Sequence, residues 1–153
     1  MRLALPVDAN TLFGTFSSKL RSQIRRPQKE GMTTHLGGLE LLDDFYHVFS
    51  VNMRDLGTPV YSRRFFETIL REFAPTASIA VVRAGDQAVA AGFLIGFRQT
   101  LEIPWASSLR SFNKLSPNML LYWSVLEHAC AQGYRAFDFG RSSIDAGTYR
   151  FKE

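Results

Sequence analysis

A short apolar strand near the end of the sequence carries two charged residues at its carboxyl end. The apolar pattern of residues 135–139 predicts the strand. Asp138 lies near its carboxyl end, and Arg141 follows just beyond it. Sites in α/β domains are usually built at the carboxyl ends of strands. The carboxylate of Asp138 could accept a proton from an attacking amine, and Arg141 could bind a phosphate or carboxylate through two N–H groups. Alternatively, the two side chains pair with each other and hold the turn.

The composition predicts one domain with one sizeable core. The chain has 153 residues, of which 46% are hydrophobic. It has no apolar run of membrane-spanning length, and residues 1–9 lack the apolar stretch of a secretory signal, so we expect a cytoplasmic protein. Cys130 lies in an apolar run and is expected to be a buried thiol. No metal site is predicted, because metal-ligand spacing is missing among His35, His47, His128 and Cys130.

The positive charge is concentrated in one segment. The net charge is +4, and residues 19–30 carry five basic side chains and one acidic one, Glu30, so the rest of the chain is balanced. Such a stripe could attract the phosphates of tRNA, a nucleotide-linked sugar or an anionic lipid, or it could be a solvated helix face. A nucleic-acid-binding module is a weaker alternative, because the aromatic residues occupy core patterns. The basic residues are Lys19, Arg21, Arg25, Arg26 and Lys29.

The first half of the sequence predicts mainly helices. Apolar residues at spacings of three and four indicate a helix over 13–29, which Pro27 should kink or end near Arg26. Gly57 and Pro75 end the two helices that follow. The predicted elements of this half are helix 13–29, strand 33–36, helix 39–56 and helix 62–73.

The second half predicts strands around one apolar helix. Two apolar runs flank Gly85-Asp86 and indicate a β-hairpin, and Pro104 marks a bulge or an irregular course in the next strand. Ser116 is expected to cap a helix that begins at Pro117 and is enclosed, because it is apolar almost all round. The predicted elements are strands 78–83, 88–97 and 100–107, helix 117–132 and strand 135–139.

This order of elements resembles a GNAT (N-acetyltransferase-like) domain. The expected fold is α/β, with a mixed, mostly antiparallel sheet of four to six strands flanked by helices. We divide the chain into a basic helical segment, 1–32, and a GNAT-like domain, 33–153, whose final strand or strands are missing.

Six stretches of the sequence carry motifs that occur together, and in this order, in a known family: 21–31, 52–62, 104–108, 120–123, 137–142 and 147–152. They resemble the FemAB-type peptidyltransferase family, especially its group associated with PEP-CTERM sorting and exopolysaccharide systems. Members carry two GNAT-like domains that transfer an acyl or aminoacyl group onto an amine. The resemblance implies that only the second domain is here, and that the chain stops at Glu153 where the family continues with Gln-Trp-Gly.

The resemblance also implies roles for individual residues. Lys152, in the pair Phe151-Lys152, matches a lysine held to act in catalysis, and a fixed ammonium with a pKa of about 10.4 would stabilise the oxyanion that forms during acyl transfer. Arg54, with Tyr61 close in sequence, matches an arginine used for the phosphate of the acceptor. Asp138 is the second catalytic candidate after Lys152. The predicted substrate-binding residues are Arg54, Tyr61, Arg141, Tyr149 and Phe151.

The acyl donor stays open between aminoacyl-tRNA and acyl-CoA. Ordinary CoA binding is disfavoured because residues 110–116, which precede the central helix, contain no glycine to let backbone amides approach a pyrophosphate. Lys114, Arg110 and the helix N-terminus could still hold a phosphate. Aminoacyl-tRNA is the better expectation from the resemblance, and no bound cofactor is expected.

The function expected from the resemblance is acyl or aminoacyl transfer, forming an amide on an amine of a cell-envelope or exopolysaccharide precursor. The acceptor would be an anionic small molecule or a lipid-linked one, and the first GNAT-like domain of the longer protein would be a partner. The alternative is a non-catalytic binding domain that keeps the fold. Without the missing parts, the 153-residue chain is expected to be inactive or nearly so.

Overall fold

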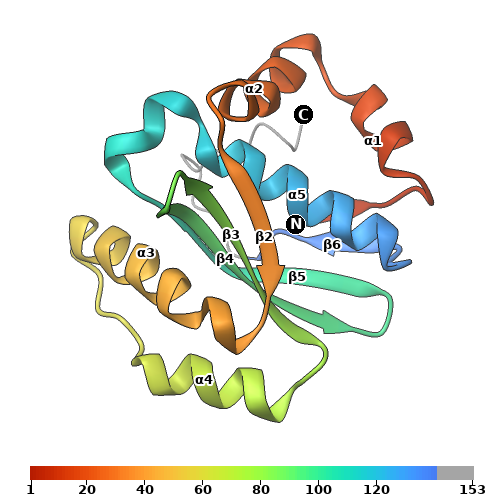
Figure 1. Cartoon of the computed structure of the whole chain (residues 1–153). Helices are drawn as coiled ribbons and strands as arrows, with labels where there is room; N and C mark the ends of the chain where they lie inside the picture. Colours follow the sequence, from red (N-terminus) through yellow and green to blue (C-terminus); the bar gives the residue numbers. More distant parts are fainter. Residues whose placement is uncertain (141–153) are drawn as a thin grey trace.

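A single sheet organises the protein, whose computed structural model describes residues 1–140. Within these residues six strands follow the order β1-β6-β5-β4-β3-β2 (Figure 1). Neighbouring strands are antiparallel except for β5 and β6, which are parallel. The mixed, mostly antiparallel sheet predicted from the sequence is therefore confirmed. The strands are β1 (Arg2–Ala4), β2 (Thr33–Gly37), β3 (Ala77–Ala84), β4 (Gln87–Phe97), β5 (Thr100–Ser108) and β6 (Ala136–Asp138).

Helices cover both faces of the sheet and enclose two separate cores (Figure 1). One face packs on α5, which is in turn covered by α1 and α2. The other face packs on α3 and α4. The helices are α1 (Ala9–Thr15), α2 (Ser18–Lys29), α3 (Leu42–Asp55), α4 (Arg63–Glu72) and α5 (Pro117–Ala131), with short 3₁₀ helices η1 (Leu39–Leu41) and η2 (Arg110–Leu115).

The segment predicted as one helix over 13–29 contains a break. Phe16 is extended, and the hydroxyl of Ser17 accepts a hydrogen bond from the amide of Leu20 at 3.2 Å, so a capping serine starts a second helix. Apolar spacing continues across the break and hid it in the sequence. Pro27 does not end α2, which runs on to Lys29, because a proline in the last turn removes only one backbone hydrogen bond.

The elements of the second half lie close to their predicted bounds. Gly85, with φ of +61°, turns the β3–β4 hairpin. Pro117 opens α5 and Leu121 is 1% exposed, so the enclosed helix is confirmed. The expected side-chain cap is absent, because Ser116 has left-handed backbone angles and its hydroxyl makes no cap hydrogen bond. No helix in the described part of the chain has the length and apolar character that crossing a bilayer requires.

Strand β1 was not predicted from the sequence. It pairs antiparallel with β6, with Arg2 opposite Asp138 and Ala4 opposite Ala136. The amide of Leu5 donates to the carbonyl of Arg135 at 2.8 Å. The edge of β6 that faces away from β5 is therefore paired, and β1 belongs to the same sheet as the rest of the domain.

Candidate active site

A β-bulge interrupts β5 next to its junction with β6. Trp105 pairs with Phe93 of β4, and Glu102 pairs with Ile95. Two residues of β5 therefore lie opposite one residue of β4, and one of the two is Pro104, which confirms the predicted bulge. Proline has no N–H to donate, so the hydrogen-bonded ladder is weakened at this point.

The bulge changes the face toward which side chains of β5 point. Leu101 and Ile103 lie in the core beneath α5, as regular alternation requires. Trp105, two residues later, lies on the opposite side against α3 and α4. The extra residue therefore brings a tryptophan to the face that carries the polar residues described next.

Three charged residues form a row across β1, β6 and β5. Arg2 is the register partner of Asp138, and Asp138 is the register partner of Glu102. Their neighbours Phe137 and Leu101 point into the core beneath α5, so the three charged side chains lie on the other face. Two carboxylates and one guanidinium thus lie beside the bulge, on the same face as Trp105.

The carboxylate of Asp138 is already occupied by partners. Its Oδ1 accepts a hydrogen bond from the amide of Gly140 at 2.9 Å, and its Oδ2 accepts one from Nε of Arg2 at 3.4 Å. The amino group of Met1 lies 3.7 Å from Oδ1. Burial, the largest single influence, raises the pKa of Asp138, but the hydrogen bonds and nearby positive charges outweigh it, and the pKa is lowered overall. This carboxylate is therefore held ionised and is a weakened proton acceptor.

The carboxyl end of β5 is fastened to the last turns of α3. The Nδ2 group of Asn52 donates to the hydroxyl of the buried Ser107 at 3.2 Å. An Nη of Arg110 reaches the carbonyl of Asp55 at 3.5 Å. Side chains two positions apart on a helix point about 200° apart, so Arg54 faces away from β5 while Asn52 faces it.

Aromatic rings cover the α3–α4 side of the bulge. Tyr61 stacks on Phe65 with ring centroids 4.6 Å apart, and Trp105 meets both rings edge-on, at 6.1 and 5.8 Å. The hydroxyl of Tyr46 donates to the carbonyl of Tyr61 at 3.0 Å and fixes the α3–α4 connection. The buried ring of Phe66 supports the group from below.

The comparisons with known proteins identify the fold and the family. The family model described as the acetyltransferase (GNAT) domain matches residues 15–153. The chain belongs to the GNAT family of acyltransferases. Comparison with curated protein sequences gives no significant match.

Solved structures with this GNAT fold include FemX, with a TM-score of 0.81 and 14% identity over 99% of this chain and 57% of FemX. The C-terminal domain of a putative lysylphosphatidylglycerol synthetase from Agrobacterium fabrum has a TM-score of 0.70 and 18% sequence identity. This match covers 99% of this chain and 50% of that one. The ribosomal-protein-S18-alanine N-acetyltransferase of Escherichia coli has a TM-score of 0.65 and 10% sequence identity. This match covers 79% of this chain and 74% of the Escherichia coli enzyme. The present chain therefore spans about half the length of FemX and of the synthetase chain.

The structure shows where three of the predicted site residues of the GNAT domain lie. Tyr61 lies against Trp105, and Asp138 lies beside the bulge, whereas Arg54 points away from β5. The other candidates lie outside the described residues: Arg141, Tyr149, Phe151 and Lys152.

Sequence reasoning missed Glu102, Asn52 and Ser107. The available signal for Glu102 was a lone acid between apolar residues of a strand, next to the bulge at Pro104. Asn52 and Ser107 lie in the matching stretches 52–62 and 104–108, but no local pattern pairs them, because they meet only through the packing of α3 on β5.

The connection before α5 is compact. In η2 the amides of Phe112 and Ser116 donate to the carbonyls of Leu109 and Asn113 at 3.0 and 3.1 Å, so they do not point outward toward a phosphate. Among residues 1–140, histidine, cysteine and acidic side chains form no cluster of three that could hold a metal ion.

An open cleft of about 490 Å³ lies at the end of the sheet where α5 ends and β3 begins. Its walls include His128, Tyr134 and Leu36. Burial lowers the pKa of His128. None of the residues around the bulge on the α3–α4 face lines this cleft. We place the candidate active site at the bulge because the charged row lies beside it and the aromatic rings contact Trp105 there.

Proposed function

We propose that this GNAT domain is part of a FemX-like transferase, which forms an amide between an acyl or aminoacyl group and an amine of a cell-envelope or exopolysaccharide precursor. One observation carries the proposal. The likeness to FemX covers 99% of the chain, whereas the likeness to the Escherichia coli N-acetyltransferase covers 79%. The proposal includes a further GNAT-like domain, because the chain matches 57% of FemX.

The compact η2 segment supports an aminoacyl-tRNA donor over acyl-CoA. A pyrophosphate cradle needs backbone amides that point outward at the start of a helix. In η2 at least two amides are used by internal hydrogen bonds, and no glycine allows a close backbone approach. A donor bound through its ester carbonyl and RNA does not need this cradle.

The acceptor amine would enter between the aromatic rings and the acidic row. Tyr61 and Trp105 would form one wall, and Glu102 would accept the proton released by the amine. Glu102 is the freer carboxylate, because Asp138 already binds Arg2 and the turn at Gly140. In this proposal Asp138 orients the turn at Gly140, and the ammonium of Lys152 would stabilise the oxyanion.

Donor binding tests the proposal in the chain alone. We expect a non-hydrolysable aminoacyl-tRNA analogue to bind the 153-residue chain in calorimetry, and acetyl-CoA to show no measurable heat. Comparable binding of acetyl-CoA, together with acetyl transfer to an amine, would assign the chain to ordinary acetyltransferases and overturn the proposal.

The role of Glu102 is tested by transfer in the assembled two-domain protein. Glu102→Gln should lower turnover by about a hundredfold to ten-thousandfold, as expected for loss of a general base. Glu127→Gln is the matched control, since Glu127 is exposed on α5. Equal turnover of the two variants would remove Glu102 from the mechanism.

A further inference from the structure

Exposed apolar side chains gather in the connection between α3 and α4. Within residues 1–140, ten large hydrophobic residues are exposed, and four of them lie within ten consecutive positions. We call these four the α3–α4 patch. They are Leu56 (60% exposed), Val60 (42%), Tyr61 (54%) and Phe65 (37%). Such a concentration of exposed apolar groups marks a contact surface.

The patch is held in place by the fold. The hydrogen bond from Tyr46 fixes the backbone at Tyr61, and the rings of Tyr61 and Phe65 are nearly parallel, at 21°. Gly57, with φ of +68°, turns the chain after α3, and the amide of Thr58 donates to the carbonyl of Met53 at 2.9 Å. In Figure 1 the connection runs along one side of the molecule from the end of α3 to the start of α4. The apolar side chains are thus presented outward on a fixed backbone.

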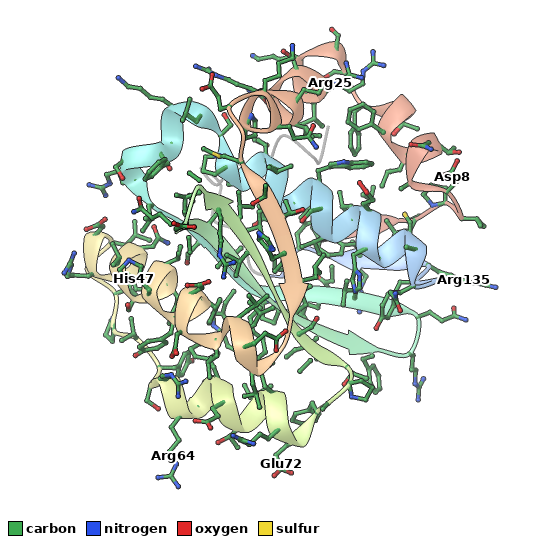
Figure 2. All side chains as sticks on the ribbon, in the orientation of Figure 1. Asp8, Arg25, His47, Arg64, Glu72 and Arg135 are labelled. Carbon is green, nitrogen blue, oxygen red and sulfur yellow. The ribbon has the colours of Figure 1, made fainter. Side chains whose placement is uncertain are left out.

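Unpaired arginines flank the patch. Arg54 and Arg64 are exposed, and neither forms an ion pair with any residue that the structure describes. Arg64 points away from the body of the protein in Figure 2. On the same helix, by contrast, Arg63 and Arg71 bind Glu67 at 3.3 and 3.0 Å. The two free guanidinium groups therefore remain available for an anionic partner.

We propose that the α3–α4 patch binds the surface of an anionic lipid bilayer. Aromatic and aliphatic side chains enter the boundary between headgroups and acyl chains, and arginines beside them bind lipid phosphates. The combination of apolar groups and free cations favours a bilayer over a soluble polyanion. Helix α2 carries more cations, but its outer face has no exposed large hydrophobic residue, so α2 alone lacks groups that insert.

Bilayer binding would place the aromatic wall of the candidate active site next to lipid, because Tyr61 belongs to both the patch and that wall. The acceptor would then be carried on a lipid. This link to the acceptor rests on the proposed function, whereas the bilayer contact is tested without any transfer reaction.

The two tryptophans report which surface binds. Trp105 lies within ring contact of Tyr61 and Phe65, and Trp123 lies on the other side of the sheet beneath α1 and α2. Vesicles of equal parts phosphatidylcholine and phosphatidylglycerol, with brominated acyl chains, should quench Trp105 in the Trp123→Phe variant. They should leave Trp123 unquenched in the Trp105→Phe variant. Quenching of Trp123 alone would place the contact at α1–α2 and overturn the proposal.

Flotation of the unlabelled chain with the same vesicles gives a second measurement that does not need tryptophan variants. Leu56→Ser with Val60→Ser should weaken binding by about tenfold, because inserted apolar groups are lost. Phe97→Ser is the matched control, since Phe97 is 71% exposed beside Arg98 in the β4–β5 turn, and it should bind like the parent.

Charge is tested by Arg54→Glu and Arg64→Glu, each of which should weaken binding by at least about fivefold and reduce the preference for phosphatidylglycerol vesicles. Absence of vesicle binding by the parent chain overturns the proposal. So does a patch variant that binds vesicles normally but transfers poorly in the assembled two-domain protein, because the patch would then contact the acceptor or a protein domain. Vesicle binding by the chain, without any transfer by the assembled two-domain protein, would leave the bilayer contact standing and count against the proposed function.

Discussion

Trp105 and Trp123, the two tryptophans of the chain, lie on opposite faces of the same sheet. Trp123 is 7% exposed and is closed in by the rings of Phe13 and Phe16, at 4.9 and 5.8 Å. Trp105 is half-buried, and its neighbouring ring, Tyr61, is 54% exposed. One face is sealed by two layers of helix, whereas the aromatic core of the other continues out to the surface.

The difference separates stability from function in this domain. The α5 face has mainly aliphatic residues around an enclosed helix, and within residues 1–140 its buried core contains no charged side chain. The α3–α4 face combines a deep aromatic core with the bulge, the row of Arg2, Asp138 and Glu102, and the exposed patch. We therefore expect changes on the α5 face to affect folding alone, and changes on the α3–α4 face to affect folding and binding together.

The largest expected effect comes from Phe66→Ala. Phe66 is fully buried, and its ring lies 5.0 Å from that of Phe45 and 5.1 Å from that of Trp105. Its loss should lower the free energy of unfolding in urea by about 3–5 kcal/mol and shift the emission of Trp105. Leu126→Ala, also fully buried but on the α5 face, should cost about 2–5 kcal/mol and leave that emission unchanged. Equal shifts in both variants would contradict the separation of the faces.

A smaller effect is expected from Ser107→Ala. It removes the hydroxyl that accepts a hydrogen bond from Asn52 and should lower the free energy of unfolding by about 1 kcal/mol. Ser124→Ala on α5 removes only a bond to a carbonyl of its own helix and should change stability by less than about 0.5 kcal/mol. Thermal denaturation of both variants measures the two losses of stability. A larger loss of stability for Ser124→Ala than for Ser107→Ala would contradict the prediction.

The smallest effect concerns Asp138 and depends on pH. Its folded-state pKa is lowered, so the ionised carboxylate stabilises the fold above its unfolded pKa of about 3.9, and this contribution is lost as pH falls through the folded pKa. Asp138→Asn should cost at most about 1 kcal/mol at neutral pH, because Arg2 is well exposed. Urea unfolding at several pH values should show the difference shrinking below about pH 4. A difference that grows in acid would contradict the assigned direction.

The elements from 77 to 139 could be predicted because their signals are local. Continuous apolar runs, the turn at Gly85 and the proline at the start of α5 each act over a few residues. Strand β1 could not be predicted, because three residues carry no pattern and the pairing partner is more than 130 positions away. The break at Ser17 was hidden because the apolar spacing runs through it.

The candidate site could be predicted only in part, for a similar reason. Tyr61 and Asp138 were predicted because each lies in a stretch that resembles a family motif. Tyr61 contacts Trp105, and Asp138 pairs with Glu102 beside the bulge. Glu102 becomes a candidate only once the register of β5 and β6 places it beside Asp138. The helical geometry that turns Arg54 away from β5 becomes clear only from the contact between Asn52 and Ser107.

The pairing of β1 with β6 also sets the order in which the sheet can be completed during synthesis. Residues 2–4 leave the ribosome more than 130 positions ahead of residues 136–138, to which they attach. At translation rates of about 5–20 residues per second, the first strand waits roughly 7–27 s for its partner. During that time its backbone is an unpaired template, which its short length and the charge of Arg2 protect from mispairing.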